Sequence, residues 1–147
     1  MTINHTPPGR FEVTMKVAVV QDDLLLVLRD AASGEGDLPG GRISTAEMLA
    51  PWAEAVSREL YEELGPDVQI ALSREPVAAF PHVVAATGAP ALGLLWEGRL
   101  LSGELQLSDE HAGYDWLPLD GPALRSRLSP TQADAIHRWL TTRSRAG

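Results

Sequence analysis

The chain has 147 residues, of which 44% are hydrophobic, and a formal net charge of -8 at pH 7. This length and composition suit one compact domain over residues 1–147, with residues 1–10 as a flexible N-terminal segment, and leave no room for a second full domain. The negative charge excludes general nucleic-acid binding, because such proteins need a basic surface to neutralise phosphates, and the absence of cysteine excludes disulfides and thiolate metal sites.

The first half of the chain predicts short strands separated by turns. Phe11 to Val20 and Leu24 to Leu28 are mainly apolar runs, joined by turn-forming residues at 21–23, so we expect a strand pair. Residues Ala31 to Gly36 predict a loop, and Leu38 to Ile43 predict a short strand.

The second half predicts a helix, further strands and a closing helix. The first helix is expected from about Pro51 to Leu64, because proline is well placed in the first turn of a helix. Strands are expected near Val68 to Ala71, Pro76 to Val84 and Leu92 to Glu104. The closing helix is expected from Ser129-Pro130 through Trp139. This order of elements predicts an α/β or α+β layered domain.

One uncharged segment, from Pro76 to Trp96, is long enough in principle to cross a bilayer. Its three prolines and two glycines would break a membrane helix repeatedly, and residues 85–90 have the composition of a turn. We therefore expect two buried strands here and no membrane association. The first residues also lack the apolar region of a secretion signal, so a cytoplasmic location is expected.

Three glutamates gather on the first predicted helix. Glu59, Glu62 and Glu63 stand at i, i+3 and i+4, and a helix turns about 100° per residue, so their side chains share one third of its circumference. An apolar stripe adjoins them, formed by Val56, Leu60 and Leu64. Carboxylates at the edge of a buried stripe must be paired, protonated or bound to metal.

Magnesium suits such a cluster, because it prefers oxygen ligands and is commonly shared between carboxylates and substrate phosphates. The alternative is a solvated acidic helix in which Arg58 pairs with Glu54 or Glu62, an arrangement without function.

The whole passage around the helix resembles the Nudix box, the signature of the Nudix hydrolase family. The resemblance is carried by a glycine, a glutamate, and then an Arg-Glu-hydrophobic-x-Glu-Glu-x-Gly run, preceded by Leu38-Pro39-Gly40. The matching residues are Gly41, Glu47, Arg58, Glu59, Leu60, Glu62, Glu63 and Gly65. A motif with this many fixed positions is far more specific than a glycine-rich loop.

The chain departs from the family pattern in two places. Ten residues separate Glu47 from Arg58, three more than in the family, and Pro66 stands where an aliphatic residue is usual. Pro51 predicts that the insertion lengthens the loop and leaves the glutamate helix in register. Glu47 also has a second interpretation, because Ser44 and Glu47 have the spacing of a helix capping box.

The resemblance implies a fold and an activity. The fold would be an α/β/α sandwich with a mixed sheet between helices. The activity would be hydrolysis of the pyrophosphate linkage in a nucleoside diphosphate derivative by attack of water on phosphorus, with Mg²⁺, or Mn²⁺ as a substitute. The box leaves the substrate open among nucleoside triphosphates, nucleotide sugars such as ADP-ribose, and dinucleoside polyphosphates, and the sequence allows a homo-oligomer as well as a monomer.

The resemblance also implies roles for individual residues. Glu59, Glu62, Glu63 and Glu47 would bind metal, and either Glu59 or Glu63 would double as the base. Arg58 would orient a glutamate through a charge-assisted hydrogen bond. Two glycines and a basic residue would contact the substrate in the loop near the metal: Gly40, Gly41 and Arg42.

A late segment, residues 108–120, resembles the part of the family in which an acid precedes a strand bearing tryptophan. Glu110 is therefore a candidate base or additional metal ligand, with a solvated loop residue as the alternative and Glu97 as a weaker competitor. Trp116 could stack on a base, but a tryptophan on a strand is more often part of the core.

Two other classes of protein remain as hypotheses. A non-catalytic Nudix-like module would bind or sense a nucleotide without turning it over, and a structural protein would use the acidic face for interaction alone. The histidines lack the close spacing of a metal site and are expected to be structural or surface residues: His5, His82, His111 and His137.

Overall fold

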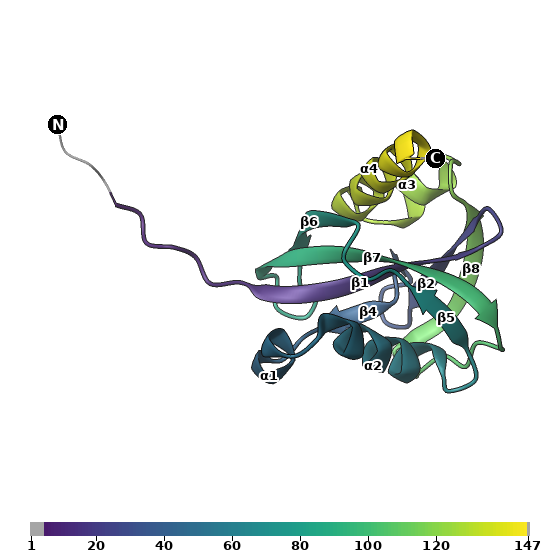
Figure 1. The fold of residues 1–147 in the computed structure, drawn as a ribbon, viewed down its shortest axis with the longest axis horizontal. Coiled ribbons are helices and arrows are strands. Elements are labelled where there is room, and N and C mark those ends of the chain that lie inside the picture. The colour runs from purple at the N-terminus through teal and green to yellow at the C-terminus, as the bar shows by residue number, and fades with distance from the viewer. Residues whose placement is uncertain (1–4, 147) are drawn as a thin grey trace.

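Helices cover both faces of a mixed β-sheet in the computed structural model of the protein, which describes residues 5–146 (Figure 1). Within these residues the sheet has eight strands and there are four helices. The strands are β1 (Glu12–Gln21), β2 (Leu24–Asp30), β3 (Gly36–Asp37), β4 (Gly40–Arg42), β5 (Gln69–Leu72), β6 (Ala78–Val83), β7 (Pro90–Ser102) and β8 (His111–Pro118). The helices are α1 (Thr45–Leu49), α2 (Trp52–Leu64), α3 (Ala123–Arg127) and α4 (Pro130–Ala146).

The sheet is built around the pairing of β1 with β7. These two strands run parallel from Glu12 opposite Ala91 to Val20 opposite Arg99. On its other edge β1 pairs antiparallel with β4 and then with β2, and β2 continues to β3 and β8. The far edge of β7 pairs antiparallel with β6 and β5. The expected mixed sheet between helices is therefore confirmed.

The central strands are buried on both faces, which explains their nearly continuous apolar sequences. In β1, Met15, Val17 and Val19 pack in the cluster that contains α2, whereas Ala18 and Val20 pack in the cluster that contains α3 and α4. The same alternation continues in β2. Two apolar layers thus hold the sheet in place between α2 on one side and α3 with α4 on the other (Figure 1).

Helix α2 begins and ends where the sequence predicts. Pro51 is its N-cap and Gly65 its C-cap, with a φ of 93° that favours glycine. The predicted stripe of Val56, Leu60 and Leu64 is buried against the sheet. The register of the glutamates on this helix follows directly from that packing.

Some elements differ from the expectations. Of the strand expected over residues 38–43, only Gly40–Arg42 forms a strand, β4, which pairs with β1, and a separate two-residue strand, β3, lies before it and pairs with β2. The break falls at Leu38 and Pro39, because proline has no N–H for a ladder, and Gly40 follows with a φ of 135°. The three-residue insertion also forms part of a short helix, α1, where only a loop was expected.

The remaining strand expectations are confirmed within a few residues, and the closing helix begins where expected but continues seven residues beyond Trp139, to Ala146. The uncharged segment forms β6 and the first half of β7, but β6 is not the buried strand that was expected, because Phe80 is its one buried residue. None of the described helices has the length and apolar character needed to span a membrane. Residues 5–11 of the chain precede β1 outside any helix or strand, and residues 1–4 of the expected flexible segment lie outside the described residues.

Candidate active site

The glutamates of α2 meet the sheet at strand β4. Glu59 and Glu63 are buried, with 9% and 8% of their surface exposed, whereas the side chain of Glu62 is about half exposed. Burial raises the pKa of the Glu59 carboxyl above its usual value, the charge of Arg58 opposes this shift, and the nearby charges of Glu63 and Glu62 add to it. A buried carboxylate cluster of this kind is stabilised by positive charge in the space that it faces.

Arg58 joins three of the glutamates. Its Nε and Nη2 donate to Glu47 at 2.8 and 3.0 Å, its Nη2 also donates to Glu59 at 3.0 Å, and its Nη1 donates to Glu62 at 3.1 and 3.2 Å. The pKa of Arg58 is raised, chiefly by its hydrogen bond with Glu47. The guanidinium therefore does more than form the i, i+4 pair of a solvated helix, because it binds carboxylates from two helices at once.

Glu47 forms the capping box considered for it and also pairs with Arg58. Its backbone N–H donates to Ser44 Oγ, and its own Oε1 accepts from the Ser44 N–H, so the capping box of α1 is formed. Its carboxylate also receives Arg58, and this hydrogen bond is the main reason that the pKa of Glu47 falls to about 2. The insertion thus keeps Glu47 beside the glutamate helix by folding into a one-turn helix.

Two glycines allow β4 to approach the carboxylates closely. The Gly40 N–H donates to Glu63 Oε2 at 2.7 Å. A Cβ atom at Gly41 would lie only 2.5 Å from Glu59 Oε2, so a side chain there would displace that carboxylate. Gly41 lets the carboxylate of Glu59 lie this close, whereas Gly40 is required because a side chain there would clash with the backbone of Met15 in β1.

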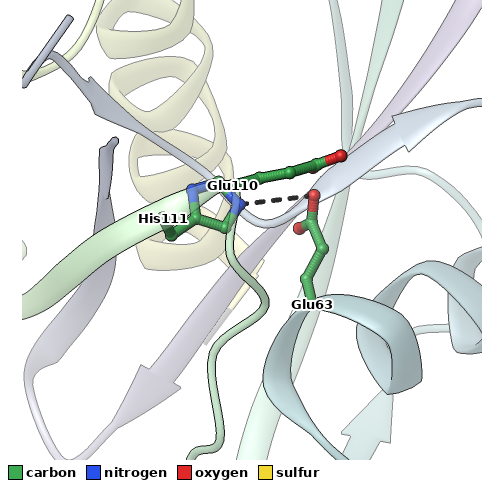
Figure 2. Close-up of side chains that lie close together, drawn as sticks. All are labelled: Glu63, Glu110 and His111. Atoms are coloured by element: carbon green, nitrogen blue, oxygen red, sulfur yellow. Dashed lines mark ion pairs between the residues drawn. The ribbon is translucent and has the colours of Figure 1, made fainter. Parts of the chain in front are cut away.

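A third group of residues forms where the start of β8 meets α2. Glu110, His111 and Glu63 present ligand atoms that all lie within 4.8 Å of one another. Figure 2 shows the three side chains converging, with His111 Nε2 directed at Glu63 Oε1 across 3.5 Å. Glu63 raises the pKa of His111, although burial opposes that shift.

The residues of these groups, except His111, line an open cleft of about 670 Å³ between β4, the helices α1 and α2, and the segment before β8. Arg42 lies at its rim, where its Nη1 contacts Glu12 at 3.2 Å. All nine candidate site residues from the sequence line this one cleft: Gly40, Gly41, Arg42, Glu47, Arg58, Glu59, Glu62, Glu63 and Glu110.

A second cavity, of about 540 Å³, adjoins the cleft and shares Glu63 and Glu110 with it. Its lining includes Lys16, whose buried ammonium donates to Asp37 at 2.9 Å. His82 also lines it, and burial followed by the charge of Lys16 lowers the pKa of that imidazole. A ligand bound at the carboxylates would therefore lie next to a cavity with both charged and apolar walls.

The cleft has the donor set that a divalent cation requires. Several carboxylates converge in a concave region, two of them are largely withdrawn from water, and one arginine is shared among three of them. Such hard oxygen donors fit Mg²⁺ or Mn²⁺. Residues Glu59, Glu62, Glu63 and Glu110 could hold the ion, with Arg58 also contacting Glu59 and Glu62. Glu47 is held by Arg58 and, in addition, by the capping box with Ser44.

The sequence interpretation missed His111 and left two other residues open. The spacing of the histidines in the sequence gave no indication of a role for His111. Its position next to the candidate residue Glu110 could have indicated one. Trp116 packs against the core cluster of α2, as the core interpretation of that residue expected. Glu97 lies near Arg143 of α4 at 3.8 Å and does not line the cleft.

Comparison with known proteins links this geometry to a family. A family model described as NUDIX domain matches residues 10–139. The fold is similar to a MutT protein from Methanosarcina mazei Go1, with 21% identity over 94% of this chain and 99% of that one and a TM-score of 0.75. It is also similar to a C. elegans Ap4A hydrolase, with 18% identity over 92% and 99% of the two chains and a TM-score of 0.71.

A MutT NUDIX hydrolase from Burkholderia pseudomallei shares more of the sequence. Its identity is 27% over 88% of this chain and 98% of that chain, with a TM-score of 0.66. No curated protein matched the chain. The family match covers both the glutamate helix and the segment that carries Glu110 and His111.

Proposed function

This chain belongs to the NUDIX family and is a pyrophosphohydrolase of that family. From this premise we propose that it hydrolyses nucleoside diphosphate derivatives with the help of Mg²⁺ or Mn²⁺. The observation that carries the proposal is the cleft in which Glu59, Glu62, Glu63 and Glu110 converge on one space. A divalent cation there would neutralise the non-bridging phosphate oxygens and orient the attacking water.

The residues of the chain itself prepare the carboxylates for this task. Arg58 fixes Glu59 and Glu62 from one side, and the Gly40 N–H fixes one oxygen of Glu63 from the other. Pre-oriented ligands lose little conformational entropy on binding, which favours catalysis by positioning. Arg58 therefore acts as a positioning residue in this proposal, and Gly40 and Gly41 allow the phosphates to approach the loop.

A carboxylate must accept the proton of the attacking water. Glu59, Glu63 and Glu110 are the candidates, because each lines the cleft and each has at least one carboxylate oxygen without a backbone partner. Of these Glu110 is the most exposed, so it can accept a proton and release it to solvent without crossing the buried cluster.

The rest of the substrate would occupy the adjoining cavity. That cavity shares Arg42, Glu63 and Glu110 with the cleft, so a phosphate bound at the carboxylates leads into it. Lys16 lines this cavity with its ammonium already paired to Asp37, so it presents an ion pair and not a free cation to the ligand. The C. elegans structure is that of an Ap4A hydrolase, and dinucleoside polyphosphates are one of the three substrate classes we propose to test.

The decisive experiment is a hydrolysis screen with product identification by mass. Nucleoside triphosphates, ADP-ribose and other nucleotide sugars, and dinucleoside polyphosphates are incubated with the full chain and Mg²⁺ in ¹⁸O-labelled water. We expect turnover of one class, with the label in a phosphate product, because water attacks phosphorus.

The matched variants are Glu62→Gln, Glu63→Gln and Glu54→Gln. The first two remove a cleft carboxylate and should abolish metal-dependent turnover while the fold is retained. Glu54 lies on the same helix but is exposed and outside the cleft, so its variant should keep wild-type activity. Full activity in both cleft variants would reject the assigned ligands.

The alternative of a non-catalytic nucleotide sensor predicts a different result from the same screen. A sensor binds one of the nucleotides tightly and releases no product with any metal. Binding without turnover, measured by calorimetry on the same panel, would replace hydrolysis by sensing as the function. A cytoplasmic location remains a prediction from the sequence.

A further inference from the structure

His111 is a buried histidine without a hydrogen-bond partner. Its side chain is only 7% exposed, and among the described residues neither ring nitrogen forms a hydrogen bond. The closest acidic oxygen is Glu63 Oε1, at 3.5 Å from Nε2. Charge-assisted N–H···O bonds are usually about 2.7–2.9 Å long, so this contact is too long for a formed ion-pair hydrogen bond. Burial of a polar group without a partner is costly, which indicates that a ligand satisfies it.

The backbone fixes His111 and Glu110 where the two cavities meet. The His111 N–H donates to the Ser108 carbonyl at 3.2 Å, and the Glu110 carbonyl accepts from the Ala31 N–H at 2.9 Å. A register irregularity between Arg29 and Asp30 of β2 accompanies this pairing. Glu110 lies in the turn before β8, so the alternation of strand side chains does not apply to it, and both residues can face Glu63.

Glu63 is positioned to offer one oxygen to this group. Its Oε2 accepts the Gly40 N–H, which leaves Oε1 on the side of His111. Figure 2 shows His111 directed at Glu63 with the Glu110 side chain beside them, and one ligand atom from each of the three residues lies within 4.8 Å of the other two. Metal–ligand bonds are roughly 2.0–2.2 Å long, so a small closure of these side chains brings all three within bonding distance of one ion.

We infer that His111 Nε2, Glu63 and Glu110 bind a divalent cation, and that the imidazole makes this part of the active site prefer a first-row transition ion to Mg²⁺. Imidazole nitrogen is a good ligand for transition ions, whereas Mg²⁺ prefers oxygen. Glu63 would then lie between an all-oxygen group, with Glu59 and Glu62, and a mixed nitrogen and oxygen group. This inference rests on the proposed hydrolase function, because it adds a nitrogen ligand to the same centre.

Pulsed electron paramagnetic resonance on the full chain with Mn²⁺ tests the inference directly. We expect ¹⁴N modulation from a coordinated imidazole, and its replacement by a ¹⁵N signal when the protein is made with ¹⁵N-labelled histidine. This measurement needs no variant, so it remains decisive even if substitution of His111 impairs folding. Bound Mn²⁺ without any nitrogen coupling would overturn the inference.

His111→Gln and His82→Gln form a matched pair of variants, because both histidines line the second cavity. In His111→Gln we expect the nitrogen signal to vanish and the Mn²⁺ affinity to fall by about 10- to 100-fold, as for other disrupted metal shells. The Mg²⁺ affinity should change by less than about threefold, because oxygen ligands dominate its binding. His82→Gln should leave all three readouts at their wild-type values.

The opposite result has a clear meaning. If His111 is only a cation that faces Glu63, it competes with metal for that carboxylate, and Mn²⁺ would bind His111→Gln equally well or more tightly. That outcome would overturn the inference while leaving Mg²⁺-dependent hydrolysis intact. Loss of the proposed function would instead appear as an absence of turnover in the wild-type screen.

Discussion

Arg58 is the residue on which the geometry of the carboxylates depends most. One planar guanidinium contacts Glu47, Glu59 and Glu62, which come from two helices separated by Pro51. A lysine keeps the charge but cannot reproduce this fork of donors. The orientation of the glutamates therefore depends on the shape of the arginine as well as on its charge.

We predict that Arg58→Lys lowers kcat by about 10- to 100-fold, in the range seen when residues that orient metal ligands are changed. Substrate KM should change much less, because Arg58 orients carboxylates and is not expected to touch the nucleotide. Steady-state kinetics at saturating Mg²⁺ measure both quantities.

The matched control is Arg125→Lys, because Arg125 also pairs with an acid, Asp134, at 3.0 Å, but on the face covered by α3 and α4. It should leave kcat unchanged. An unaltered kcat in Arg58→Lys would show that the charge alone is sufficient.

His82 provides a pH-dependent prediction away from the carboxylates. Burial and then the charge of Lys16 lower the pKa of His82 below its usual 6.5, while Asp37 opposes the shift. Between the folded-state value and 6.5 the unfolded chain binds more protons at this residue, so the free energy of unfolding decreases as the pH falls through that window.

The difference between wild type and His82→Gln isolates this contribution. Urea denaturation from about pH 8 to about pH 5 should show a smaller acid-side loss of stability in the variant than in the wild type. The imidazole resonances of His82 in a nuclear magnetic resonance titration give the pKa itself. A value at or above 6.5 would contradict the prediction.

At the scale of elements, the close approach of β4 to α2 forms the floor of the cleft. A Cβ atom at position 41 would meet the carboxylate of Glu59, whose long side chain can move aside. We predict that Gly41→Ala folds with little loss of stability but weakens Mg²⁺ binding by about tenfold, because Glu59 is displaced from its place. Isothermal calorimetry measures the affinity.

Gly121→Ala is the control for this change. The nearest atom to a Cβ at Gly121 is the Pro118 side chain at 3.3 Å, and the site lies outside the cleft. Its metal affinity should equal that of the wild type. Equal affinities in both alanine variants would show that Glu59 does not need its observed position.

The ends of α2 and its buried stripe could be predicted from the sequence because local chemistry determines them. Pro51 favours the first turn of a helix, and Gly65 accepts the positive φ of the last. The separation of β3 from β4 and their pairing with different strands could not be predicted, since strand pairing depends on neighbours far away in the chain. Helix α1 was not predicted because Pro51 makes a continuous helix from Ser44 into α2 unfavourable.

The same distinction applies to the site. Glu59, Glu62 and Glu63 share one helical turn, so their proximity follows from the helix repeat alone. The meeting of Glu63 with His111 depends on the pairing of β8 with β2 and on the register irregularity at Asp30, neither of which leaves a local pattern. Glu110 could be proposed only through the family resemblance.

For the molecule as a whole, a net charge of -8 and a buried carboxylate cluster make the native state responsive to cations. A cation that binds only the folded chain stabilises it by about 2.7 kcal/mol at 100 times its Kd. For a protein of this size that corresponds to a rise of roughly 5–10 °C in Tm. We expect this shift with Mg²⁺ or Mn²⁺ in a thermal scan.

General screening of negative charge must be separated from specific binding. Sodium chloride at the same ionic strength should give a much smaller shift, and Glu63→Gln should lose most of the response to divalent ions. Equal shifts with sodium and magnesium would favour the interpretation of the acidic face as a solvated surface.

The parallel pairing of β1 with β7 also affects how the protein is made. Glu12 pairs with Ala91, which is synthesised 79 residues later, so the centre of the sheet cannot form until that part of the chain has been made. At about 5–20 residues per second on the ribosome, that delay is roughly 4–16 seconds. During this time β1, which is buried on both faces in the folded protein, is exposed in the nascent chain. We therefore expect newly synthesised molecules to bind holding chaperones until translation has passed β7.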